Sequence, residues 1–167
     1  MYNSVDLKFA SGAKSIEALL CDLGRYDLHI QPARRLRSHN VYSLASVARA
    51  YLLGALQQQN IPTSHIPDLF HRIDQNALDY ACDQFEVGEI DTLICVFLSF
   101  TPDEDFTGVC TNAAELPEIL QTLGHFTAID LSEFLARKLQ GKLYCGCRRD
   151  SFRGFWSGLA FVRAYQI

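Results

Sequence analysis

The chain has 167 residues, 49% of them hydrophobic and 20% charged, so it can bury a core and is not a disordered, collagen-like or coiled-coil-only protein. Its longest apolar runs, such as residues 93–100, are far shorter than the ~20 residues that cross a bilayer. The N-terminus lacks the basic stretch followed by an apolar one that marks a secretory signal. We therefore predict a cytoplasmic globular protein with no membrane partner.

The net charge of −4 is unevenly distributed along the chain. Residues 1–75 contain eight Lys and Arg against six Asp and Glu, whereas residues 76–167 contain seven against thirteen. In the first half, one short segment gathers five basic or polar residues, namely Arg34, Arg35, Arg37, His39 and Asn40. Such a cluster favours a polyanionic partner, although a solvated loop would have the same composition.

The first two elements expected along the chain are short. Residues 4–11 fit a strand, because their apolar side chains alternate, and equally a two-turn helix capped by Ser4 and ended by Gly12. Residues 14–23 have apolar side chains at helical spacing, which predicts a helix, and Gly24 is a typical stop signal.

A basic hairpin and two further helices are expected next. Residues 28–41 alternate at their ends around a polar centre, and Pro32 marks a turn, which predicts a small β-hairpin with a charged tip. Ser43 then caps the clearest element, an amphipathic helix over residues 44–59. Residues 65–73 have one apolar face and predict another short helix.

The second half mixes strands and helices. A run rich in β-branched and aromatic residues predicts a buried strand over residues 90–100, and an acidic loop follows at residues 102–108. The other expected elements are a helix over residues 113–123, a strand over 126–129, a helix over 132–139 that ends at Gly141, and a strand-like segment at 159–162. The predicted fold class is therefore α+β.

The order of the early elements indicates how the chain is divided. Helix, glycine turn, helix, basic hairpin and capped amphipathic helix is the order of a winged helix-turn-helix domain. We predict such a domain over residues 1–75, followed by a small mixed α/β C-terminal domain over residues 85–167 that senses an effector or binds a partner. The boundary falls near residues 75–88.

Three segments resemble the MerR-type DNA-binding domain: residues 30–35 (IQPARR), residues 40–43 (NVYS) and residues 44–73. In that family a hairpin of the form GL-x-P-x-R…(Y/R)-x-Y-S leads into a helix, a short G-(I/V)-(S/P)-x-x-x-I link and a second helix. Residues 60–66 (NIPTSHI) stand at the link. The resemblance covers residues 4–73, and it implies a DNA-binding transcriptional regulator that acts on double-stranded DNA as a homodimer.

Departures from the family pattern bear on that expectation, among them Asn40-Val41-Tyr42, which stands where an Arg often precedes the Tyr. Family members usually have an Arg-Tyr/Phe-Tyr motif at the end of the recognition helix, and here only Arg25 and Tyr26 remain of it. The expected recognition helix also contains Glu17 and Asp22, whose charges oppose approach to phosphates.

The candidate DNA-binding residues come from the second helix and from the hairpin. Basic hairpin side chains would neutralise backbone phosphates, and the start of a helix presents free N–H groups to them. The predicted DNA-binding residues are Lys14, Ser15, Arg25, Tyr26, Arg34, Arg35, Arg37, His39, Asn40 and Tyr42.

A protein-interaction module is the alternative function. The weak basicity of the first half and the acids in the recognition helix favour a winged-helix fold that contacts protein, as an antirepressor, an adaptor or an antitoxin-like partner. An enzyme is not expected, because the sequence contains no G-x-S-x-G, H-E-x-x-H, P-loop or G-x-G-x-x-G motif, and no cofactor is predicted.

Six cysteines occur in the chain, and we expect them to be free thiols. Cys21 and Cys95 lie in apolar runs and are predicted to be core residues. The pair Cys145 and Cys147 could bind metal or sense redox state with Cys82, Cys110 or His125, but the sequence shows no second pair of ligands and no metal site is predicted. Incidental thiols are the favoured interpretation.

Overall fold

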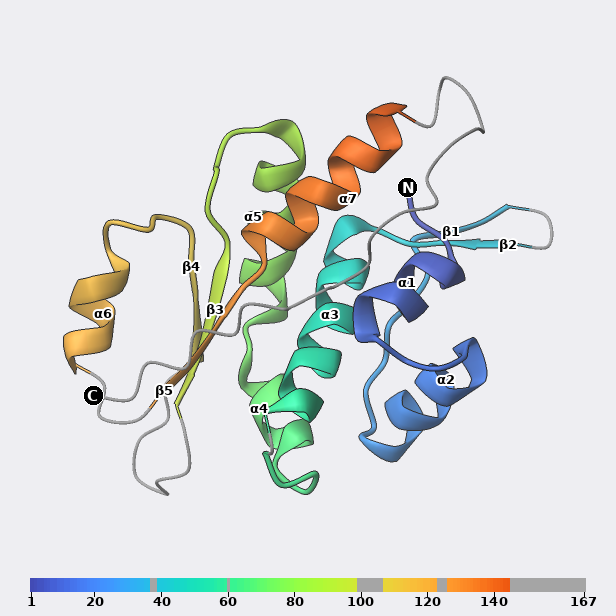
Figure 1. Cartoon of the computed structure of the whole chain (residues 1–167), viewed down its shortest axis with the longest axis horizontal. Coiled ribbons are helices and arrows are strands. Elements are labelled where there is room, and N and C mark those ends of the chain that lie inside the picture. The colour runs from blue at the N-terminus through green and yellow to red at the C-terminus, as the bar shows by residue number, and fades with distance from the viewer. Residues whose placement is uncertain (37–38, 60, 99–106, 123–125, 145–167) are drawn as a thin grey trace.

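The computed structural model describes residues 1–36, 39–59, 61–98, 107–122 and 126–144. Over these residues the fold is mixed α+β, with seven helices and two small antiparallel sheets. A three-stranded sheet lies at one end of the molecule and a two-stranded hairpin at the other, with most of the helices between them (Figure 1).

Two short helices open the chain. Residues 4–11 form α1 (Ser4–Ser11), which decides between the strand and the helix that the sequence allowed. Its N-cap is Asn3 rather than Ser4, because the Asn3 side chain accepts from two backbone N–H groups while Asp6 accepts from the N–H of Asn3. Gly12 ends α1 in the left-handed conformation, with φ of 69°.

The second helix, α2 (Ile16–Arg25), begins after the N-cap Ser15 and continues through Gly24. The expected stop at Gly24 is wrong, because the left-handed turn occurs later, at Asp27 with φ of 52°. An aspartate tolerates this conformation better than most residues, so the chain turns there without glycine.

The hairpin is shorter than the sequence predicted. Strands β1 (Arg34–Leu36) and β2 (His39–Val41) pair antiparallel, whereas residues 28–33 form no strand. The apolar pattern at Leu28 arises from core packing instead, since its side chain is buried and its N–H donates to the Leu23 carbonyl. The predicted alternation therefore reflected tertiary burial and not a strand.

The central helix is α3 (Leu44–Gln58), which the sequence predicted with Ser43 as its N-cap, and both features are confirmed. Eleven of its residues are buried, because other elements pack around it. Helices α4 (Ile66–Arg72) and α5 (Gln75–Val87) follow.

The sheet of the second half has the order β4-β3-β5, with β3 (Ile94–Leu98) paired antiparallel to both β4 (Thr107–Cys110) and β5 (Phe126–Asp130). One face contributes Cys95 and Ile129 to the main core. The other face packs Ile94 and Cys110 against α6 (Leu116–Thr122). Strand β4 differs from the sequence prediction, which places its first two residues, Thr107 and Gly108, in the acidic loop over residues 102–108.

The last described element is α7 (Ser132–Tyr144). The expected end at Gly141 is wrong, because α7 continues past it, and a single glycine costs a helix only about 1 kcal/mol. The predicted tail strand at residues 159–162, the thiols Cys145 and Cys147, and His125 lie outside the described residues.

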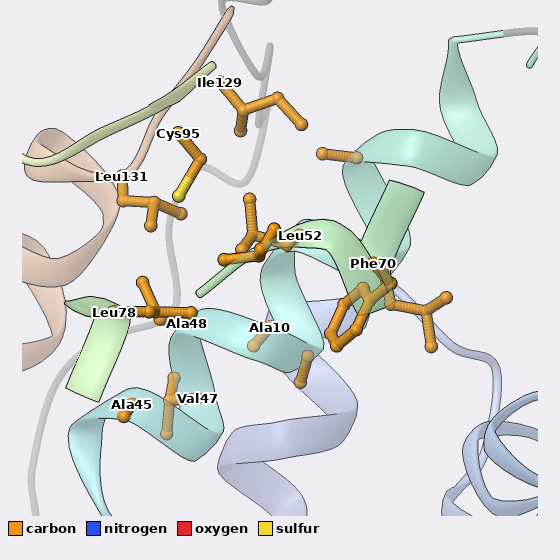
Figure 2. Packing of buried hydrophobic residues seen from close by; sticks show 14 of the residues in the cluster. Ala10, Ala45, Val47, Ala48, Leu52, Phe70, Leu78, Cys95, Ile129 and Leu131 are labelled. Carbon is orange, nitrogen blue, oxygen red and sulfur yellow. The ribbon is translucent and has the colours of Figure 1, made fainter. Parts of the chain in front are cut away.

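A single core extends across both halves of the described chain. Figure 2 shows members of this one cluster packed around α3, among them Ala10 of α1, Leu52 of α3 itself, Leu78 of α5, Cys95 of β3 and Leu131. The two predicted domains therefore share buried surface, and their boundary stays a prediction.

Candidate nucleic-acid interface

The β1–β2 hairpin gathers the basic cluster on an exposed ribbon. Arg35 lies opposite Asn40, and Leu36 lies opposite His39, with all four residues exposed. Residues paired directly across an antiparallel ladder point to the same face, so Arg35 and Asn40 share one face while Arg34 lies on the other with His39. Residues 28–41 contain no carboxylate, which leaves the hairpin with a net positive charge.

The hairpin is attached to the N-terminus at its base. The Tyr2 N–H donates to the Tyr42 carbonyl at 3.1 Å, and the Tyr42 N–H donates back to the Tyr2 carbonyl at 2.8 Å. Both tyrosines belong to the core, with Tyr42 only 8% exposed. Burial raises the pKa of the Tyr2 phenol well above its usual range, so that group stays protonated.

The start of α2 is polar, and the side chains of Ser15 and Glu17 already accept hydrogen bonds there. Lys14 is exposed, and the Ser15 hydroxyl oxygen accepts the Ala18 N–H at 3.1 Å. Hydrogen bonds from its own backbone N–H and from Ser15 lower the pKa of the exposed Glu17 carboxyl, which therefore remains charged. This carboxylate competes with any phosphate for the positive end of the helix.

The other end of α2 is held by an ion pair. Arg25 lies 3.4 Å from Asp22, which also accepts a hydrogen bond from Gln57 of α3 at 3.3 Å. Asp22 is thus partly neutralised by its neighbours. Tyr26 is the C-cap of α2 and is 4% exposed, so its ring packs in the core.

The exposed face of α2 contains two residues that sequence reasoning missed. Leu20 is 59% exposed, and Cys21 is exposed rather than a core residue as the sequence predicted. Among the residues of α2, only Leu19 and Leu23 are buried, because this helix packs against the core along one side. The helical spacing of apolar residues in the sequence includes Leu20 together with Leu19 and Leu23, so it does not show which of the three is exposed.

The predicted site residues lie in the hairpin and at the two ends of α2. Pairing of β1 with β2 brings together Arg34, Arg35, His39 and Asn40, whereas Lys14 with Ser15 and Arg25 with Tyr26 occupy opposite ends of α2. Figure 1 shows α2 and the hairpin on the side of the molecule away from the three-stranded sheet. Arg37 lies outside the described residues.

A cleft of about 620 Å³ lies beside the base of the hairpin, between the segment before β1 and helices α3 and α5. Arg49 donates through Nε to Gln75 Oε1 and through Nη2 to Asp79 Oδ1, each at 2.6 Å. The cleft also contains Asp27 and Asp83, so its charge is opposite to that of the hairpin. No local sequence pattern indicates this cleft, because its residues come from distant segments.

The buried thiols of the described residues offer little chemistry. Cys82, Cys95 and Cys110 are buried, and burial raises the pKa of Cys82 to about 12 and that of Cys95 further still. A thiol with so high a pKa is a poor nucleophile and a poor metal ligand. In the part of the chain that the structure describes, no group of three or more His, Cys, Asp or Glu is arranged to hold a metal ion.

No protein-family model matches the chain, and no curated protein matches its sequence. None of the helices in the described ranges combines the length and the apolar composition needed to span a bilayer.

Proposed function

We propose that the protein is a DNA-binding transcriptional regulator of the cytoplasm, in which residues 4–73 act as a winged helix-turn-helix of MerR type. The single observation that supports this most is the exposed hairpin, where Arg34 and Arg35 project from opposite faces of a ribbon without carboxylates. A basic ribbon of this kind suits the phosphate backbone of double-stranded DNA, whose contacts are mostly with Arg and Lys.

Each group of residues has a distinct role in this proposal. Helix α2 enters the major groove with its exposed face, while the hairpin, with His39 and Asn40 beside the arginines, lies along the backbone. Lys14 approaches a phosphate at the start of α2, and Arg25 does so at its end. Tyr26 and Tyr42 act from the core, where they hold α2 and the hairpin in place.

A homodimer is the proposed working form, because two copies that read two half-sites raise affinity and specificity together. The outward face of α5 is the proposed contact. Tyr80 and Val87 are 67% and 68% exposed, and with Ala77 and Gln84 they follow the three–four–three spacing of a coiled-coil seam. A second copy with the same face would bury these side chains.

Alkylation of Cys21 tests the position of α2 on DNA, since the thiol lies on the exposed face of that helix. At low salt, a nonspecific duplex should slow modification of Cys21 by iodoacetamide several-fold, as measured by mass spectrometry of the Cys21 peptide. Cys110, which is buried, serves as the internal control for changes in the fold. Equal modification rates of Cys21 with and without saturating duplex would contradict the proposal.

A protein-interaction module is the second candidate, and the exposure of Leu20 beside Cys21 favours it. An apolar side chain in the centre of α2, next to the charged Glu17, suits a protein surface better than a phosphate backbone. In this case Leu20→Ala would weaken a protein complex, whereas Arg34→Ala would leave that complex intact.

A further inference from the structure

Lys138 of helix α7 contacts the first helix of the chain, α1. Lys138 Nζ lies 5.6 Å from the ring centre of Phe9 on α1 and 5.9 Å from that of Phe134 on α7 itself. It also lies 3.9 Å from Asp6 Oδ1. Its side chain is only 20% exposed, so the two rings and the carboxylate act on a partly desolvated ammonium group.

A second contact fixes the same face of α7 to α3. The rings of Phe134 and Tyr51 stack with centres 4.2 Å apart and planes inclined by 18°. This stack holds the start of α7 on the central helix, and Lys138, one turn later, reaches α1. The position of α7 is thus defined relative to both helices.

From Lys138 an unbroken series of short contacts leads to the hairpin. Asp6 faces Lys138 through Oδ1, and through Oδ2 it accepts the N–H of Asn3 at 2.9 Å. The residue before Asn3 is Tyr2, which is joined to Tyr42 by two backbone hydrogen bonds. Strand β2 ends one residue before Tyr42, at Val41.

We propose that Lys138 is a positioning residue that couples α7 to the β1–β2 hairpin through the capping box of α1. A ligand or partner that displaces α7 would withdraw Lys138 from Asp6, loosen the bridge between Tyr2 and Tyr42 and free the base of the hairpin. Such a coupling would regulate DNA binding by the hairpin, and this regulatory role rests on the proposed function. The coupling between α7 and the hairpin can itself be measured without DNA.

Hydrogen exchange of single amides, followed by NMR, is the test. In Lys138→Met, which keeps the apolar stem and loses the charge, exchange of the Tyr2 and Tyr42 amides should rise about fivefold, the change that corresponds to roughly 1 kcal/mol. Lys138→Arg should restore the slow rates. Arg137→Met is the matched control, because Arg137 is the next residue, its side chain is 73% exposed, and it forms an ion pair with Glu133 of the same helix.

The outcomes separate the coupling from a loss of stability and from the proposed function. Unchanged exchange at Tyr2 and Tyr42 would overturn the coupling, and so would an equal rise at the Cys95 amide in the sheet, which indicates global loosening. If exchange rises locally, Lys138→Met should also elute from duplex DNA at lower salt than the wild type, and unchanged elution would overturn the regulatory role. A wild-type protein that never binds DNA would refute the proposed function and leave the coupling supported.

Discussion

Gly54, in the middle of α3, lies directly against the carbonyl group of Ser11 at the end of α1. A Cβ atom at position 54 would be 2.2 Å from the Ser11 oxygen and 2.7 Å from its carbonyl carbon. These are backbone atoms, so no side-chain rotation relieves the overlap. The absence of a side chain at Gly54 therefore sets how closely α1 approaches the central helix.

Replacing Gly54 with alanine should destabilise the fold. We expect Gly54→Ala to lower the free energy of unfolding by about 2–3 kcal/mol, because α1 must move away from α3. Gly24→Ala is the matched control, since no atom lies within 4 Å of a Cβ there, and it should raise stability by up to ~1 kcal/mol through helix propensity. Urea denaturation followed by circular dichroism measures both changes, and equal stability of the two variants would contradict this packing.

The reactivity of the thiols should follow their burial. At pH 8 in the native protein, Cys21 should react quickly with a thiol reagent while Cys82 and Cys95 remain protected, because their raised pKa values leave almost no thiolate. In urea all of them should react at similar rates. Peptide mapping after timed quenching measures the ratio, and rapid labelling of Cys82 in the folded protein would show that the core is arranged differently.

Removal of the Glu17 charge should strengthen binding to duplex DNA. Glu17→Gln is expected to increase affinity about twofold, the effect of one unit charge at ~10 Å in water. Glu118→Gln, at an exposed position on α6, should leave affinity unchanged. Fluorescence anisotropy with a labelled nonspecific duplex measures both, and weaker binding by Glu17→Gln would count against α2 as the helix that faces DNA.

The pKa of Glu17 also predicts a pH dependence. Because its pKa is lower in the folded state than in the unfolded chain, ionised Glu17 stabilises the fold above the unfolded pKa, and this contribution disappears as the pH falls through the folded value. Wild type and Glu17→Gln should therefore converge in thermal stability under strongly acidic conditions. Scans at several pH values down to that range check the convergence.

The outward face of α5 should control the oligomeric state. The double variant Tyr80→Lys with Val87→Lys places two charges in the proposed seam, and it should sediment as a monomer where the wild type sediments as a dimer. Val5→Lys, at a 48% exposed position on α1, is the control and should remain dimeric. A double variant with the wild-type mass would place the contact elsewhere.

Local patterns in the sequence predicted the elements whose signals are local. The spacing of apolar residues and the cap at Ser43 identified α3 nearly to the residue. The alternation near Leu28 was misleading, because a single loop residue buried in the core imitates the end of a strand. Strand β4 escaped prediction because Thr107–Cys110 becomes a strand only through its pairing with β3.

The candidate site was predictable only in part. The cluster of arginines can be recognised in the sequence. The structure adds that Arg35 and Asn40 are paired across the hairpin and therefore lie on the same face of it. The exposure of Leu20 depends on which side of α2 meets the core, and the contact of Lys138 with Asp6 joins residues far apart in the chain. Neither relationship has a local signal, since both arise from packing between helices.

DNA binding by the hairpin is tested most directly by retention of the protein on a column of nonspecific duplex DNA across a salt gradient. We predict that the wild-type protein elutes well above ~0.2 M salt, because phosphate contacts give steep salt dependence. The Arg34/Arg35/Arg37 triple alanine variant should elute much earlier, whereas Arg137→Ala, on the exposed side of α7, should match the wild type. Flow-through of the wild type at low salt, or identical elution of the triple variant, would contradict the proposal that the hairpin binds DNA.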